Sequence, residues 1–369
     1  MDNSYRPERY NSHTSGMESD IRSVGWRSPS NIALIKYWGK RKGQIPGNPS
    51  ISITLSKSFT ETVMRYSPAR PGKGRLKNFI FEGSQQKAFA DRLRSYLKSV
   101  TALYPFLPDY DLSIESRNSF PHSSGIASSA SSMAAVALCL TSMEQQLFGS
   151  PSVVDSFFIK ASYAARLGSG SAARSVYPGY VLWGRYTRIP HSADEFAIPL
   201  NDLVHKDLRE MKDSILIVDE KPKAVSSSQG HSLMHSSPWA PVRYLQAADH
   251  TRRMIRVLSS GDIEEFVRIV ESEALTLHSL MMNSGQGYIL MKPGTLEIIQ
   301  KVRDFRNDTG IPVAFSLDAG PNVHLIYPGD FADIVRKFVE QELLGSCSRR
   351  QWIDDHAGRG PVIIQSGDR

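Results

Sequence analysis

The alternation of apolar and polar positions predicts strands at several places in the chain. Within residues 50–55 (SISITL) every second residue is apolar, as in a strand with one buried face. Residues 24–35 mix apolar side chains with Arg27 and Asn31, and Pro29 stands in their middle, so no regular element is predicted there. Short apolar runs bounded by turn residues predict further strands at 78–81, 113–116, 180–183, 214–218, 313–317 and 323–326.

Apolar residues that recur every three or four positions predict helices. Between residues 128 and 147 this spacing joins Met133, Val136, Ala137, Leu140 and Met143. The same spacing predicts further helices at 89–103, 153–164, 263–277 and 296–305. Strands and helices are mixed without a regular strand–helix–strand alternation, so the predicted fold class is α+β.

The length of 369 residues corresponds to two or three folding units, or to one large enzyme of two lobes. We predict a mobile polar tail at 1–22, an N-terminal lobe at 23–212 and a C-terminal lobe at 213–369. The tail lacks the apolar stretch of a secretory signal. The longest apolar run, 133–140, is far shorter than the ~18 residues that span a bilayer, so no association with a membrane is expected.

Composition narrows the class of protein. Hydrophobic residues make up 40% of the chain, which is enough for a substantial core and excludes a wholly disordered or fibrous protein. The net charge of +7 favours an anionic partner, but the basic residues are spread along the chain, so nucleic acid is not expected. The two cysteines, Cys139 and Cys347, exclude a disulfide framework and a cysteine-based zinc site and fit a cytoplasmic protein.

A glycine followed by hydroxyl side chains precedes the helix predicted from residue 128. The sequence at 121–132 reads PHSSGIASSASS, with Gly125 near its centre. The start of a helix presents unpaired N–H groups and the positive end of its dipole, so it binds phosphate well. No Gly-Lys-Ser/Thr follows, so this is not the Walker motif. Serine-rich sequence also caps helices and forms turns, and the spacing alone leaves both interpretations open.

Two further segments present cations. At 31–42 (NIALIKYWGKRK), Lys and Arg residues stand beside two aromatic residues, with no acidic residue before Glu61. This pattern fits a clamp for a small anionic substrate, and it also fits a solvated basic loop. At 168–175 (GSGSAARS), a G-x-G-x-x-A match follows a predicted helix and not a strand, so the dinucleotide-binding fingerprint is rejected. What remains is a loop that presents Arg174, either to a carboxylate or phosphate or to solvent.

One acidic residue has a distinctive position. Asp318 follows the strand predicted at 313–317 and precedes a tight turn, Ala-Gly-Pro-Asn. A partly desolvated carboxylate there suits a catalytic base, and it would equally suit a carboxylate that caps the turn. His231 and His235 lie four residues apart, but no Glu follows His231, so no metal site is predicted there. The chain has no G-x-S-x-G elbow, which argues against a hydrolase triad.

Together and in this order, four segments resemble the diphosphomevalonate decarboxylases of the GHMP kinase superfamily. Ile126 stands for the family's Leu in the second segment and Ala173 for its Cys in the third. The resemblance extends over 26–327 and implies a two-lobed fold with a deep cleft between the lobes. The matching segments are 31–40 (NIALIKYWGK), 125–131 (GIASSAS), 169–175 (SGSAARS) and 318–322 (DAGPN).

The resemblance implies an ATP- and Mg²⁺-dependent decarboxylation in isoprenoid biosynthesis. The 3-hydroxyl of (R)-5-diphosphomevalonate takes the γ-phosphoryl group of ATP. The 3-phosphate then leaves as C1 departs as CO2, which yields isopentenyl diphosphate, ADP and phosphate. By motif position, Asp318 would orient or deprotonate the hydroxyl, Arg174 would hold the substrate carboxylate, and Lys36 would neutralise charge on the transferred group.

The resemblance also implies which residues bind the ligands. The expected substrate-binding residues are Asn31, Tyr37, Trp38, Lys40, Ser169, Ser171 and Ser227. Mg²⁺ would be held through the ATP phosphates and by Ser128 or Ser131. A homodimer is the family-level expectation. The expected ATP-binding residues are Gly125, Ala127, Ser128, Ser129 and Ser131.

The chain departs from the family pattern in places that leave more than one activity open. His122-Ser123-Ser124 stand where the family usually has Thr-Ala-Ala, and Ser132 stands where it has Gly. At 226–230 (SSSQG), the Arg that often follows the serines is absent, which removes one cation for the distal phosphate. The acceptor is therefore the diphosphate, the monophosphate or another 3-hydroxy acid. The sequence is also compatible with a GHMP-type kinase that does not decarboxylate, and with a non-catalytic protein that binds an anionic metabolite or RNA.

Overall fold

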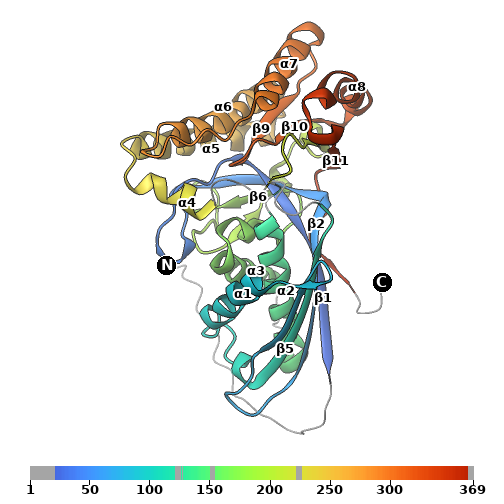
Figure 1. Cartoon of the computed structure of the whole chain (residues 1–369). Helices are drawn as coiled ribbons and strands as arrows, with labels where there is room; N and C mark the ends of the chain where they lie inside the picture. Colours follow the sequence, from blue (N-terminus) through green and yellow to red (C-terminus); the bar gives the residue numbers. More distant parts are fainter. Residues whose placement is uncertain (1–20, 121–125, 127, 150–153, 222–226, 365–369) are drawn as a thin grey trace.

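Two lobes, each built around its own sheet, make up the molecule (Figure 1). The computed structural model describes residues 21–120, 126, 128–149, 154–221 and 227–364. The first sheet has eight strands and the second has four, and helices pack on both, which confirms the predicted α+β class. Most of the predicted tail lies outside the described residues, and the lobe limits near residue 212 stay a prediction.

Two long strands, β1 (Arg22–Ile35) and β2 (Ser50–Pro68), organise the first sheet. The alternating segment at 50–55 is only the beginning of β2. The sequence predicted no element where β1 runs, because Pro29 interrupts the apolar pattern. The strand tolerates Pro29 because its pairing with β2 changes register between Pro29 and Asn31, and a bulge accommodates a residue that has no N–H.

The other strands of the first sheet extend it on both sides. The strand order is β12-β1-β2-β5-β3-β4, with β6 paired to β2 and β7 to β6. β3 and β5 run parallel, which is the exception in this sheet. The strands predicted at 78–81, 113–116 and 180–183 are confirmed. Their full bounds and those of the remaining strands are β3 (Leu76–Phe81), β4 (Ser84–Gln85), β5 (Tyr110–Asn118), β6 (Tyr180–Trp183), β7 (Ala197–Pro199) and β12 (Val362–Ile363).

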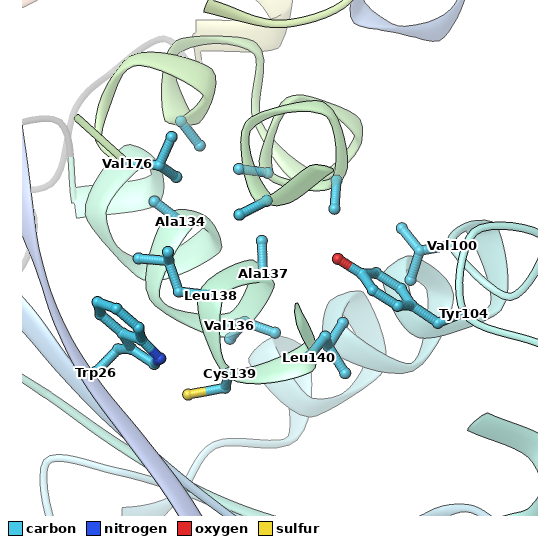
Figure 2. Close-up of a cluster of buried hydrophobic side chains, with 14 of the residues drawn as sticks. Trp26, Val100, Tyr104, Ala134, Val136, Ala137, Leu138, Cys139, Leu140 and Val176 are labelled. Carbon is cyan, nitrogen blue, oxygen red and sulfur yellow. The ribbon is translucent and has the colours of Figure 1, made fainter. Parts of the chain in front are cut away.

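Three helices predicted from the sequence cover one face of this sheet, namely α1 (Lys87–Ser99), α2 (Ser128–Phe148) and α3 (Val154–Gly168). α2 packs against α3, β1 and β2, and its alanines allow close approach on every side. In Figure 2, Trp26 of β1 and Tyr104 lie on opposite sides of the α2 side chains. This packing fixes the first turn of α2 relative to the end of β1.

The second lobe consists of an antiparallel sheet with helices packed on it. The strand order is β11-β8-β10-β9. The strands predicted at 214–218, 313–317 and 323–326 and the helices predicted at 263–277 and 296–305 are confirmed. The strands are β8 (Met211–Leu216), β9 (Ala314–Leu317), β10 (Val323–Pro328) and β11 (Trp352–His356). The helices are α4 (Ser227–Ser232), α5 (Ala240–Ser260), α6 (Ile263–Met282), α7 (Pro293–Thr309) and α8 (Ala332–Phe338).

The sequence did not predict α5, which lies beside α6 in Figure 1. The buried face of α5 includes Arg243 and His250, which interrupt the apolar spacing. A tight turn joins the two helices, because Gly261 takes a positive φ of 80° and the Asp262 side chain accepts the N–H of Glu265 at 3.0 Å. Arg243 and His250 of α5 bond to Glu273 of α6, next to the residue that follows β1.

The two lobes are tied together at several places. The Asp355 carboxylate of β11 is fully buried and accepts the successive backbone N–H groups of Ser56, Lys57 and Ser58 in β2, at 2.9, 2.7 and 2.7 Å. After β11 the chain returns to the first sheet, where β12 pairs with β1. Among the described residues, no helix is long and apolar enough to cross a membrane.

Candidate active site

A cavity of about 980 Å³ brings together segments that are far apart in the sequence. Its walls come from the end of β1, from α1, from the first turns of α2, from the segment after α3, and from the turn after β9. The structure places most of the predicted site residues around this cavity. Those that line it are Asn31, Lys36, Tyr37, Trp38, Lys40, Ser128, Ser129, Ser169, Ser171, Arg174 and Asp318.

The remaining predicted residues do not line the cavity or are not described there. Ser131 is fully buried, and its hydroxyl lies 2.6 Å from that of Thr60, so the structure does not bring it to the cavity. Ser227 opens α4, and Gly125 and Ala127 lie outside the described residues. Of the two serines proposed for Mg²⁺, only Ser128 is at the cavity.

An ion pair crosses from one lobe to the other inside the cavity. The Lys36 Nζ lies 3.0 Å from Asp318 Oδ1. Lys36 follows β1 of the first lobe, and Asp318 follows β9 of the second. The Lys36 side chain is 3% exposed and that of Asp318 is 28% exposed, so the carboxylate faces the cavity while the ammonium lies behind it.

Arg174 is a buried cation whose partners are neutral. It ends a short 3₁₀ turn (Gly170–Arg174) and is 2% exposed. Its Nε and Nη2 donate to Asn31 Oδ1 at 3.3 and 3.1 Å, and its Nη1 donates to Ser50 Oγ at 2.5 Å. Within the described part of the chain, no carboxylate lies within ion-pair distance of this guanidinium. Burial lowers the pKa of Arg174 to about 10, against the opposing effects of Asp318 and Tyr37, so it stays charged at neutral pH.

Aromatic residues form the wall beside Arg174. The Tyr37 ring packs against Trp183 and His231, with ring centroids 4.8 and 4.1 Å apart. Burial raises the pKa of Tyr37, so its hydroxyl stays protonated. The Tyr37 hydroxyl and the indole N–H of Trp38 are buried, and neither has a hydrogen-bond partner among the described residues. Buried donors without partners are costly, and since both side chains line the cavity, a small shift would present these donors to a ligand.

His231 and Lys40 lie next to this wall. Burial, together with the charges of Lys40 and Arg174, lowers the pKa of His231 to about 3, so the imidazole is neutral and its Nδ1 accepts the N–H of Gly39 at 3.1 Å. The Lys40 Nζ donates to Gln44 Oε1 at 2.9 Å, and burial lowers the pKa of Lys40. Sequence analysis considered His231 only as a metal ligand and missed its role as the acceptor of the Gly39 N–H.

Buried polar residues of the second lobe hold Lys36 in place, and sequence analysis missed them. The Lys36 backbone N–H donates to Glu273 Oε2 at 2.7 Å, and its carbonyl accepts from Arg243 Nη2 at 2.9 Å. Glu273 is fully buried and also accepts from Arg243 and His250. His278 Nε2 lies 3.0 Å from the Asp318 carbonyl oxygen. The available signal was a pair of polar residues, Glu273 and His278, on the apolar face of a predicted helix.

The first turn of α2 forms the part of the cavity whose groups suit phosphate. Ser128 and Ser129 line it, and the Ser129 hydroxyl lies 3.4 Å from that of Ser169. The N–H groups at the start of α2 have no partners within the helix, so they and the hydroxyls suit phosphate oxygens. The described residues contain no cluster of three or more acidic, His or Cys side chains that would hold a metal. With hydroxyls such as those of Ser128 and Ser129 at this part of the cavity, the site fits a Mg²⁺ ion that is bound mainly by the phosphates of a ligand.

Comparison with known proteins supports the resemblance over nearly the whole chain. Residues 28–196 match the diphosphomevalonate decarboxylase-like N-terminal domain, and residues 214–359 match the mevalonate 5-diphosphate decarboxylase C-terminal domain. The diphosphomevalonate decarboxylase of Eremothecium gossypii is 30% identical over 319 residues, which cover 81% of this chain and 76% of that protein.

Solved structures agree in fold. The mevalonate diphosphate decarboxylase of Staphylococcus aureus superposes with a TM-score of 0.78 and 27% identity, over 94% of this chain and 99% of that one. A protein named MDDEF, solved in complex with MVAPP, AMPPCP and magnesium, gives a TM-score of 0.77 and 25% identity, over 94% of this chain and all of that one. With its two matching domains and this shared fold, the chain belongs to the diphosphomevalonate decarboxylase family.

Proposed function

We propose that this protein catalyses the ATP-dependent decarboxylation of (R)-5-diphosphomevalonate to isopentenyl diphosphate, ADP, phosphate and CO2. One observation carries the proposal: a buried guanidinium without a carboxylate partner among the described residues and a Lys–Asp pair share one cavity with the start of a helix. The three features suit a substrate carboxylate, a reacting hydroxyl and ATP phosphates, respectively. The related structure with MVAPP, AMPPCP and magnesium contains the same combination of ligand types.

The first half of the reaction moves the γ-phosphoryl group of ATP to the 3-hydroxyl. Ser128, Ser129 and the first N–H groups of α2 bind the phosphates of ATP. Mg²⁺, when bound, neutralises charge on these phosphates. The Asp318 carboxylate faces the cavity and accepts the proton of the 3-hydroxyl as the hydroxyl oxygen attacks the γ-phosphorus of ATP. Lys36 fixes Asp318 Oδ1 from behind and places a positive charge beside the transferred group.

The second half breaks the bond between C1 and C2. The electron pair of this bond forms the new double bond between C2 and C3, and the 3-phosphate leaves with the electrons of the C3–O bond. Arg174 binds the substrate carboxylate and orients it for loss as CO2. Its position is fixed because Asn31 and Ser50 hold three of its nitrogens, which leaves the guanidinium little freedom to move.

The diphosphate end of the substrate lies along the wall of Tyr37, Trp38 and Lys40. Tyr37 and Trp38 offer buried donors, and Lys40 offers a cation whose charge is partly desolvated. Ser169 and Ser171 add hydroxyls from the segment after α3. Ser227, at the start of α4, stays a proposed contact for the same group.

The test supplies the protein with ATP and, separately, with mevalonate, its 5-phosphate and its 5-diphosphate, while ADP and CO2 are measured. The proposal expects ADP and CO2 in equal amounts with the 5-diphosphate. ADP without CO2 would identify a kinase, and CO2 with the 5-phosphate alone would identify a decarboxylase of the monophosphate. Turnover with none of the three would contradict the proposal.

We also propose that the protein acts as a homodimer in the cytoplasm. The resemblance to the family supports the dimer, and the two cysteines, both unpaired thiols buried in the structure, fit a reducing compartment. Sedimentation equilibrium at micromolar concentration tests the dimer, and imaging of the tagged protein in its own cells tests the location.

A further inference from the structure

A second cavity, of about 960 Å³, lies where the two lobes meet. Its first-lobe wall comes from β1, from the middle of β2 and from the segment before β6. Its second-lobe wall comes from the start of β8 and from the residues after β11. None of its lining residues lines the active-site cavity. Its volume is in the range of small-molecule sites, about 300–1,000 Å³.

Positive side chains from separate segments converge on this cavity. Within the described part of the chain, Lys212 and Arg359 take part in no ion pair, and Arg209 donates its Nε only to the Val204 carbonyl, at 3.0 Å. The carboxylates that line the cavity are Asp202 and Glu210, and both are exposed to solvent, as are Arg209 and Arg359. The lining cations outnumber these carboxylates and are Arg27, Arg209, Lys212 and Arg359.

The positive charge near Arg27 is only partly neutralised. The Glu61 carboxylate forms ion pairs with Arg27 Nη2 at 2.7 Å and with Arg117 Nη2 at 2.5 Å. One carboxylate thus serves two guanidiniums, and the pair of arginines keeps a net positive charge beside the cavity.

His356 adds a neutral donor to the same wall. Burial lowers the pKa of His356, and Lys212 and Lys57 lower it further, against the opposing effects of Asp355 and Asp354. The imidazole is therefore uncharged at neutral pH and offers one N–H to a ligand.

Much of the remaining lining is apolar, although Ser56 and Asn201 also contribute to it. Phe59 and Pro178 are partly exposed and Val362 is 50% exposed, so these side chains present the accessible apolar surface, whereas Leu55, Tyr180 and Met211 are almost completely buried. An inorganic anion would use the cations and leave this surface in water. A ligand with an apolar chain would cover it, and burial of apolar area stabilises a complex by roughly 25 cal/mol per Å².

We propose that this inter-lobe cavity binds an amphipathic anion, a phosphate- or diphosphate-bearing molecule with an apolar chain. The guanidiniums of Arg209 and Arg359 suit bidentate contacts with phosphate oxygens, and Lys212 adds a point charge. The apolar chain of the ligand lies against Phe59, Pro178 and Val362. Because the ligand touches both lobes, it stabilises the arrangement of the lobes described here.

The test uses calorimetry on the full chain, with the active-site cavity saturated by mevalonate diphosphate, AMPPCP and Mg²⁺. Geranyl diphosphate, pyrophosphate and geraniol serve as probes for the whole ligand, the head group and the chain. We expect geranyl diphosphate to bind one further site, at least about tenfold more tightly than either fragment. Lys212→Ala and Arg359→Ala should each weaken this binding by about tenfold or more, since each removes one charge-assisted contact.

Lys206→Ala is the matched control, since Lys206 is exposed and does not line the cavity. This control should leave the affinity for geranyl diphosphate unchanged, and all three variants should have the Tm of the wild-type protein. The proposal is wrong if the saturated protein does not bind geranyl diphosphate, or if Lys212→Ala and Arg359→Ala bind it as the control does. Pyrophosphate that binds as tightly as geranyl diphosphate would overturn the assignment of the apolar surface.

Discussion

Replacement of Glu273 by Gln is the most informative perturbation of the active site that substitutes none of the residues lining the cavity. Glu273 is fully buried and accepts two bonds from Arg243, at 2.6 and 2.7 Å, one from His250 at 2.6 Å and one from the Lys36 N–H at 2.7 Å. Glu273→Gln keeps the size of the side chain but removes the charge. It also turns one acceptor oxygen into a donor group, which faces Arg243 together with either His250 or the Lys36 N–H.

The magnitude follows from the burial of Arg243, whose side chain is only 2% exposed. Breaking a buried ion pair by removing one partner costs about 3–5 kcal/mol, because the other charge stays buried and unpaired. For a folding unit of 150–250 residues, 1 kcal/mol shifts Tm by about 2–4 °C, so we expect a decrease of roughly 6–20 °C. Differential scanning calorimetry measures it.

The catalytic effect is separate from the loss of stability. Glu273 accepts the Lys36 backbone N–H and Arg243 donates to the Lys36 carbonyl, and the Lys36 side chain in turn holds Asp318. A displacement of about 1 Å in a reacting group costs up to about 10²-fold in rate. We therefore expect kcat of the folded variant, measured well below its Tm, to fall between about tenfold and a hundredfold, while KM for ATP changes little.

The matched control is Glu144→Gln. Glu144 lies near the far end of α2 and forms an ion pair with Lys160 at 2.6 Å, and both side chains are more than 90% buried. This variant should lose comparable stability and keep wild-type kcat at a temperature where it is folded. Equal kcat losses in Glu144→Gln and Glu273→Gln, after correction for the folded fraction, would show that Glu273 acts only through global stability and would refute the reasoning.

Further substitutions test the chemistry, the substrate contacts and the connection between the lobes. Asp318→Asn should lower kcat by at least about 10² with little change in KM, since general base catalysis is typically worth about 10²–10⁴; near wild-type CO2 release would contradict the mechanism. Arg174→Gln should also lower kcat, and the double variant should lose little more than one single variant, because residues that act as one unit are not additive; additive losses in steady-state assays would separate their roles. Lys40→Ala should raise KM for the phosphorylated acid by about tenfold to a hundredfold, whereas a rise confined to ATP would reassign this residue. Asp355→Ala leaves one buried and two partly buried N–H groups of β2 without their acceptor, so urea unfolding should show a loss of about 1–3 kcal/mol; unchanged stability would mean that Asp355 does not tie the lobes.

Local pattern determined much of the fold. Helical spacing over 128–147 and 263–277 predicted α2 and α6, because a helix with a buried face needs apolar residues every three or four positions regardless of what it packs against. Likewise, the alternation at 50–55 predicted the beginning of β2. The four motif segments also identified the family, since each needs particular residue types at fixed spacing around the reaction.

Local pattern failed where distant partners decide the structure. β1 runs through Pro29 because a bulge against β2 accommodates it, and α5 forms although Arg243 and His250 interrupt its apolar face. Both polar side chains are acceptable in the interior only because Glu273 of α6 pairs with them. A buried charge needs hydrogen-bond or ion-pair partners, and packing determines which residues become partners, which spacing along the chain does not encode.

The sequence by itself therefore determined the type of most elements, the family and the chemical nature of the candidate residues. Only the tertiary structure decided which of them meet. It paired Lys36 with Asp318 across the lobes, left Arg174 without a carboxylate partner among the described residues, and turned Ser131 toward Thr60. The physical reason is that hydrophobic periodicity specifies which face of an element is buried, whereas the contacts of that face depend on how all elements pack together.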